Sequence, residues 1–129
     1  MAGLILDSMG TIKMQVLENA MLMLQRINAL NESYAIEAKK GKPSPTIVMN
    51  IKRQLVTLAA NTKSQFGMIS DQVTNLYVQS SRGSSDQARV RTIREGIAAV
   101  KQAIEIGQTQ TIQKHEVHRE KAKPAAGDE

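Results

Sequence analysis

Apolar residues recur every three or four positions along three long segments of the chain, which two short polar connectors separate. The central segment, residues 46–79, contains no proline and only one glycine. Steps of three and four residues align side chains on one face of an α-helix. These 34 residues would form a rod roughly 50 Å long, whose apolar face needs other helices to cover it. The pattern therefore predicts a helical bundle with one continuous central helix.

The segment before it, at about residues 7–40, alternates steps of four and three residues without interruption. Leu17, Met21 and Leu24 form a second apolar stripe beside this seam. A helix with two adjacent apolar stripes packs against two partners, which favours a bundle over a two-stranded coiled coil. The seam consists of Val16, Ala20, Met23, Ile27, Leu30 and Tyr34.

The third segment, at about residues 85–117, repeats the same steps and adds a row of small residues on another face. The connectors before it are short, and one contains two prolines, at positions 43 and 45. Short connectors make consecutive helices antiparallel neighbours. We therefore expect an all-α fold: a long antiparallel up-down-up three-helix bundle or coiled coil over residues 1–118, with a disordered tail over residues 119–129.

Polar residues interrupt the seam of the central segment. A strict heptad repeat places Thr62, Gln65 and Gln72 on that seam, where buried polar residues set register or oligomer number. Alternatively, the stripe drifts to Phe66 and Val73 and leaves both glutamines at its edge.

Composition restricts both the core and the chemistry. Aromatic residues make up 2% of the chain, which has seven Met and no Cys. Disulfides, zinc–thiolate sites and thiol catalysis are thereby excluded. Flexible Met side chains fill gaps between helices, or they line an exposed groove for a partner helix.

Basic residues outnumber acidic ones by 17 to 12, and the excess is spread along the chain. The densest basic stretch is Arg89, Arg91, Arg94 and Lys101, which could contact phosphates. That segment has no aromatic residue for base stacking, and carboxylates offset part of its charge. A solvated helix face is therefore the preferred interpretation, and nucleic-acid binding is the alternative.

His115 and His118 are three residues apart, so on a helix both imidazoles could reach one metal ion. Metal sites in bundles also need carboxylates at matching spacing on other helices, and no Glu-x-x-His pair of this kind occurs elsewhere. Glycine-rich phosphate loops and Ser/His/Asp groupings are lacking as well. We expect neither a catalytic residue nor a cofactor or metal.

The longest uninterrupted apolar run has five residues, at positions 20–24, and no basic stretch precedes an apolar one at the N-terminus. Membrane spans and cleaved signal peptides are longer. We therefore expect a cytoplasmic protein, and leaderless export is compatible with the same features.

Together these patterns predict a non-enzymatic helical module that binds protein, as a structural, adaptor or chaperone-like component. Long helices poor in aromatics leave apolar surface uncovered, so we expect a homo-oligomer, with a dimer favoured, and allow a heterologous protein helix as partner. The alternative is a nucleic-acid or anionic-surface binder that uses the four basic residues above. The expected interface residues lie on the three seams: Met23, Ile27, Leu30, Leu55, Leu58, Ile69, Ile97 and Ile104.

Overall fold

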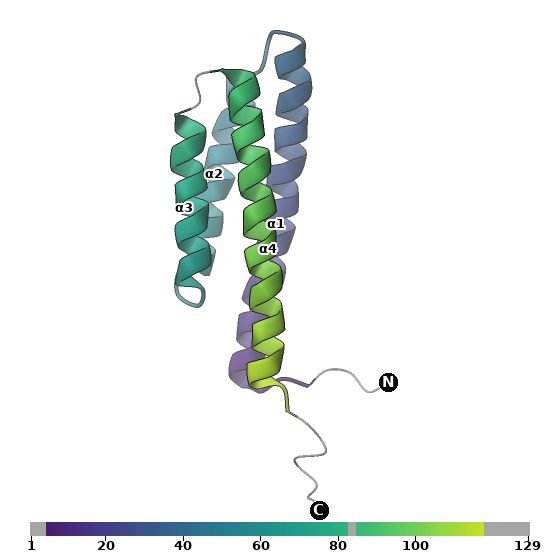
Figure 1. Cartoon of the computed structure of the whole chain (residues 1–129), viewed down its shortest axis with the longest axis vertical. Coiled ribbons are helices and arrows are strands. Elements are labelled where there is room, and N and C mark those ends of the chain that lie inside the picture. Colours follow the sequence, from purple (N-terminus) through teal and green to yellow (C-terminus); the bar gives the residue numbers. More distant parts are fainter. Residues whose placement is uncertain (1–4, 83–84, 118–129) are drawn as a thin grey trace, which may run out of the picture.

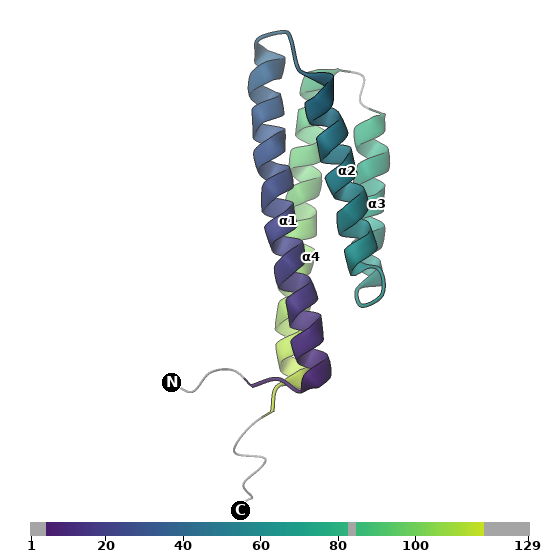
Figure 2. The same ribbon diagram turned by 180° about the vertical axis from the view of Figure 1, so that it is seen from behind.

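The computed structural model describes residues 5–82 and 85–117, which form an all-helical fold with four α-helices (Figure 1). The helices run in alternating directions, and each one contacts the two beside it, with α4 closing the circle against α1 (Figure 2). Their bounds are Ser8–Lys39 for α1, Pro45–Thr62 for α2, Gly67–Ser81 for α3 and Asp86–His115 for α4.

The prediction of one continuous helix over residues 46–79 is wrong, and so is the count of three helices. The chain reverses at residues 63–66, and α3 returns beside α2. The reversal lies in the stretch without large apolar residues between Leu58 and Phe66. Folding back lets Leu58 of α2 and Val73 of α3 enter the same core, and both are fully buried. The all-helical class is confirmed, but the bundle has four helices. The expected tail over residues 119–129 lies outside the described residues.

Side-chain caps determine where three of the helices begin. Asp7, Ser44 and Ser85 each accept a hydrogen bond from a backbone N–H two or three residues later. Pro45 occupies the first turn of α2, where a proline costs no hydrogen bond. Gly41 follows α1 with a φ of 80°, a left-handed conformation that glycine adopts without strain.

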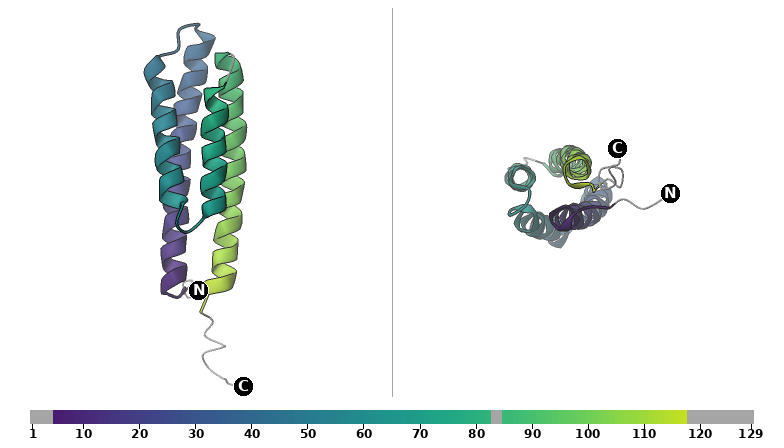
Figure 3. Two further views of the ribbon diagram at one scale, coloured as in Figure 1. Left: turned by 90° about the vertical axis from the view of Figure 1, so that its left-hand side faces the viewer. Right: turned by 90° about the horizontal axis from the view of Figure 1, so that it is seen from below.

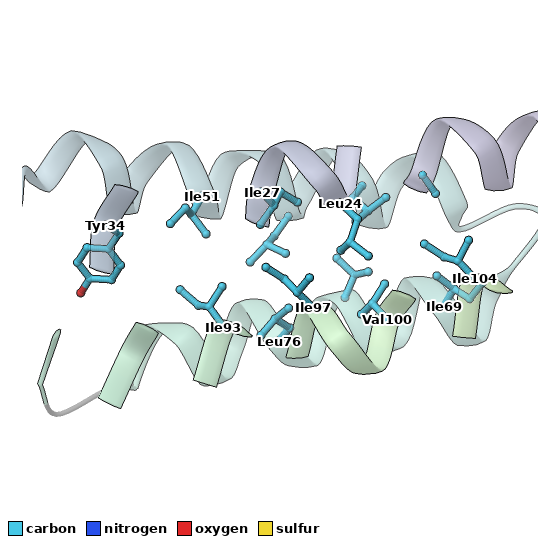
Figure 4. Close-up of a cluster of buried hydrophobic side chains, with 14 of the residues drawn as sticks. Leu24, Ile27, Tyr34, Ile51, Ile69, Leu76, Ile93, Ile97, Val100 and Ile104 are labelled. Atoms are coloured by element: carbon cyan, nitrogen blue, oxygen red, sulfur yellow. The ribbon is translucent and has the colours of Figure 1, made fainter. Parts of the chain in front are cut away.

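The core fills the space between the four helices and is almost entirely aliphatic (Figure 4). Gly96 of α4 allows α3 to approach closely, because the side chain of Leu76 occupies the space where a Cβ would lie. Fully or almost fully buried members are Leu17, Leu24, Ile27, Tyr34, Ile51, Leu55, Leu58, Val73, Leu76, Ile93, Val100 and Ile104.

Of the two interpretations of the central seam, the drift of the stripe to Phe66 and Val73 describes the structure better. Val73 is fully buried and Phe66 packs against the core, whereas Gln72 is exposed and Gln65 lies in the turn. Thr62 is buried, but its hydroxyl donates to the carbonyl of Leu58 in its own helix, at 2.9 Å.

Helices α1 and α4 are longer than α2 and α3 and continue together past the α2–α3 turn (Figure 3). The change occurs near Gly107, where Leu17 of α1 and Ile69 of α3 both approach. We call the part beyond this level the two-helix arm; it comprises residues 5–16 and 108–117. Its end is closed by an isolated antiparallel bridge between Leu6 and Glu116. No helix in the described ranges has the length and apolar character that crossing a membrane requires.

Candidate binding surfaces

The structure divides the eight expected interface residues into two groups. Six are buried by the chain's own helices and hold the bundle together: Ile27, Leu55, Leu58, Ile69, Ile97 and Ile104. Met23 and Leu30 are only partly buried, and both pack against the core from α1. The Met23 sulfur lies 3.4 Å from the Asn61 side-chain nitrogen near the end of α2. Six of the eight therefore offer no free surface in this fold.

The four basic candidates do not form one free face. Arg89 is tied into the bundle, because its Nε donates to the Ser80 carbonyl at 2.8 Å and its Nη1 to the Tyr34 hydroxyl at 3.0 Å. Arg94 makes a two-pronged contact with the Glu32 carboxylate, at 3.1 and 3.2 Å. Arg91 and Lys101 are exposed and form no hydrogen bond or ion pair with residues 5–82 or 85–117.

The network around Arg89 joins three helices at one end of the bundle. The Tyr34 hydroxyl of α1 donates to Asp86 of α4 at 2.6 Å, while Arg89 reaches back to the end of α3. Burial raises the pKa of Tyr34, and the hydrogen bond to Asp86 acts in the same direction. The phenol therefore stays protonated and keeps donating, and Arg89 serves the fold rather than a ligand.

Where α1 and α4 meet on the side away from α2 and α3, two hollows adjoin. The first, of about 450 Å³, lies between the C-terminal part of α1 and the start of α4; the second, of about 310 Å³, lies further along the same seam. Arg94 lines both hollows, so they are consecutive parts of one groove, which we call the α1–α4 groove. Arg91 and Lys101 lie in its two parts.

The two-helix arm carries a second exposed apolar surface. Met9 and Ile12 of α1 are 47% and 48% exposed, and Ile5 and Val117 beside the arm's end are exposed as well. Met9 belongs to a row at steps of seven residues, followed by Val16, Met23 and Leu30. Met23 and Leu30 adjoin α2, whereas Met9 and Val16 belong to the arm, which extends past the α2–α3 turn (Figure 3). The sequence analysis did not predict this surface, although the apolar row at steps of seven residues indicates it.

Hydrogen bonds between Asp7 and His115 join the start of α1 to the end of α4; we call these contacts the clasp. The Asp7 carboxylate accepts from the Gly10 N–H at 2.7 Å, and the His115 Nδ1 lies 3.1 Å from the same carboxylate. The Asp7 N–H donates to the His115 carbonyl at 3.0 Å. The bond from Gly10 lowers the pKa of Asp7 most, and His115 lowers it further. The clasp therefore favours a charged Asp7.

This clasp also bears on the expected pair of His115 and His118. The Nδ1 of His115 is engaged with Asp7, and His118 lies outside the described residues. Across residues 5–82 and 85–117, no group of three acidic or histidine side chains is arranged to hold a metal ion.

The α1–α4 groove thus combines apolar and charged side chains of both helices, whereas the arm surface is apolar, and both suit contact with another chain. Comparison of the sequence and the fold with protein families, curated proteins and solved structures found no significant match.

Proposed function

We propose that this chain is a non-enzymatic helical protein-interaction module that self-associates as a dimer through the two-helix arm. The observation that carries the proposal is the apolar row on α1, which continues through Val16 and Met9 after its covering helix α2 has ended. Next to that row, Ile12 adds a further half-exposed aliphatic side chain.

The fold itself indicates what covers such a surface. Over most of their length, α1 and α4 are covered by two antiparallel helices, α2 and α3. The arm of a second copy is also a pair of antiparallel helices, so it can take the place of that hairpin beyond the turn. Two arms that overlap in this way are related by a two-fold axis, the commonest symmetry of soluble dimers.

Burial of the exposed side chains contributes several kcal/mol to a dimer. Full burial of a Met or Ile side chain contributes about 1.5–3 kcal/mol, and Met9 and Ile12 have about half of that left to gain. Each side chain counts twice in a symmetric interface. Removing both therefore weakens association by roughly 4 kcal/mol, which corresponds to about a thousandfold change in the dissociation constant.

The test is light scattering on the double variant Met9→Asp/Ile12→Asp. Acidic residues near the start of α1 suit the helix dipole, so the arm should stay helical. The wild-type chain should scatter as twice its mass of 14.2 kDa and the variant as one chain. A matched control is Met49→Asp/Val56→Asp, which changes two α2 residues of similar exposure, 55% and 53%, far from the arm.

A monomeric wild-type chain would refute the proposal, as would equal loss of the dimer in the control. The alternative of a nucleic-acid or anionic-surface binder keeps only Arg91 and Lys101 of its four proposed cations free, because Arg89 and Arg94 are engaged within the bundle. We therefore rank it second.

A further inference from the structure

We propose that the α1–α4 groove is a docking site for an acidic amphipathic helix of a partner protein. This inference deepens the proposed function, since both concern protein binding, but it uses the opposite side of the α1–α4 pair from the side that α2 and α3 cover. Different residues carry the two proposals, and different variants test them.

The groove has an apolar base and one exposed aliphatic wall. Val90 and Ile97 of α4 line its floor, and Leu24 of α1 contributes from the other side. Ile36 on the α1 wall is 57% exposed, one of the largest exposures among the aliphatic residues in the described helices. A partner's apolar side chains would find contact along this line without any rearrangement of the core.

Charge gives the groove its preference for an acidic partner. Four cations line it, against the single carboxylate of Glu32, so its net charge is +3. Lys39, Arg91 and Lys101 form no hydrogen bond or ion pair within the parts of the chain that the structure describes. Arg94 and Glu32 neutralise each other across the groove, and both are about half exposed, so this pair contributes little stability and can open to a competing carboxylate.

The dimensions of the groove suit a helix. It extends along α1 from Met21 to Lys39, which at 1.5 Å per residue is roughly 27 Å, or a partner helix of about 18 residues. The seam between two packed helices accepts the side-chain ridges of a third. Arg91 and Lys101 are ten residues apart along α4, roughly 15 Å, so carboxylates about three turns apart on the partner can meet both.

The same observations disfavour nucleic acid as the occupant. Single-stranded nucleic acid is commonly held by aromatic side chains on which bases stack, and helix α4 contains no aromatic residue. Duplex binding rests on many phosphate contacts, and three free cations is a small set for that purpose. An aliphatic wall such as Ile36 gains nothing from phosphate but gains from an apolar helix face.

The experiment measures binding of a fluorescent designed helix to the full chain by anisotropy. The probe is a peptide of about 18 residues with Leu at every third or fourth position and Glu on both flanks. Its partner probe has the same Leu positions with Lys in place of Glu. We expect the acidic probe to bind and to become more helical by circular dichroism, and the basic probe to bind at least about 30-fold more weakly.

Two groove variants and two matched controls identify the site. Arg91→Glu/Lys101→Glu should weaken binding of the acidic probe by about 30-fold or more, and Ile36→Asp by about 10-fold. The charge control is Arg53→Glu/Lys63→Glu, which reverses two exposed cations outside the groove, and the apolar control is Val56→Asp. Each control should change the dissociation constant less than about threefold.

Three results would overturn the inference. The first is no binding of the acidic probe, and the second is equal weakening of probe binding by the groove and control variants. The third is displacement of the probe by duplex DNA whose own binding depends on Arg91 and Lys101. The last result would favour an anionic-surface binder instead. Failure here is separable from failure of the dimer, because Arg91→Glu/Lys101→Glu should leave the light-scattering mass unchanged. Conversely, Met9→Asp/Ile12→Asp should leave probe binding unchanged.

Discussion

Arg89 and Arg91 lie two residues apart on α4, yet they have different roles. Arg89 bonds to the Tyr34 hydroxyl and the Ser80 carbonyl, whereas Arg91 is exposed in the α1–α4 groove. Two positions along a helix turn a side chain by about 200°, so the two cannot share a face. That much is readable from the sequence. Two of the acceptors that Arg89 finds, the Tyr34 hydroxyl and the Ser80 carbonyl, come from other helices, and only the packing of those helices decides them.

Gly10 is a residue whose importance depends on packing. It is buried where α1 meets the end of α4, and a Cβ added to it would overlap the Cβ of His115. That atom is attached to the backbone and cannot swing aside, so Gly10→Ala should lower the free energy of unfolding by about 1–3 kcal/mol, measured by urea denaturation.

The control for this change is Gly67→Ala at the start of α3. No heavy atom lies within 4 Å of a Cβ built there, so the greater helix propensity of alanine should leave stability equal or raise it by up to about 1 kcal/mol. Equal loss of stability in both variants would show that the close approach of α1 and α4 does not require glycine at position 10.

Asp7 makes the stability of the arm depend on pH. Its pKa lies below the ordinary value of 3.8 in the folded chain, first because of the Gly10 N–H and then because of His115. A lowered pKa in the folded state contributes stability above the unfolded-state pKa, and this contribution is lost as the pH falls through the folded-state value. Asp7→Asn keeps a capping side chain but removes the charge.

We therefore expect Asp7→Asn to be less stable than wild type at pH 7, with the difference disappearing in strong acid, where Asp7 is protonated. Denaturant melts at several pH values measure this. Asp71→Asn, at an exposed position of α3, is the control for removing one carboxylate outside the clasp, and its melts are measured at the same pH values. A difference in the free energy of unfolding between wild type and Asp7→Asn that persists unchanged into strong acid would contradict the charge argument.

At the scale of elements, the α2–α3 turn explains the difference between expectation and structure. The apolar stripe has a gap from Leu58 to Phe66, and a gap of that length fits both a continuous helix and a turn. Helix propensity alone does not choose, since Lys63, Ser64 and Gln65 are tolerated in helices. The choice comes from the tertiary gain of placing two helices over α1 and α4.

A two-glycine insertion tests the turn directly. Between Ser64 and Gln65 it lengthens an exposed loop, so it should lower the free energy of unfolding by less than about 1 kcal/mol. The same insertion between Gln54 and Leu55 interrupts α2 and shifts buried residues out of register, and should cost about 3 kcal/mol or more. Urea melts of both proteins measure the difference, and equal losses would contradict a turn at this position.

For the whole molecule, the sequence by itself determined that the chain is helical and where its first and last helices lie. The expected ranges of about 7–40 and 85–117 compare with Ser8–Lys39 and Asp86–His115. These features depend on contacts between residues three or four positions apart and on caps such as Asp7 and Ser85, which are local in the chain.

Only the tertiary structure decided that the bundle has four helices and that six of the expected interface residues are internal. It alone also decided that α1 and α4 extend past the α2–α3 turn. It also decided which cations remain free beside the α1–α4 groove. The physical reason is that periodicity indicates which face of a helix is apolar. Which other helix covers that face depends on contacts between residues far apart in the chain. Met9 and Met23 belong to one row in the sequence, but α2 is long enough to cover only Met23.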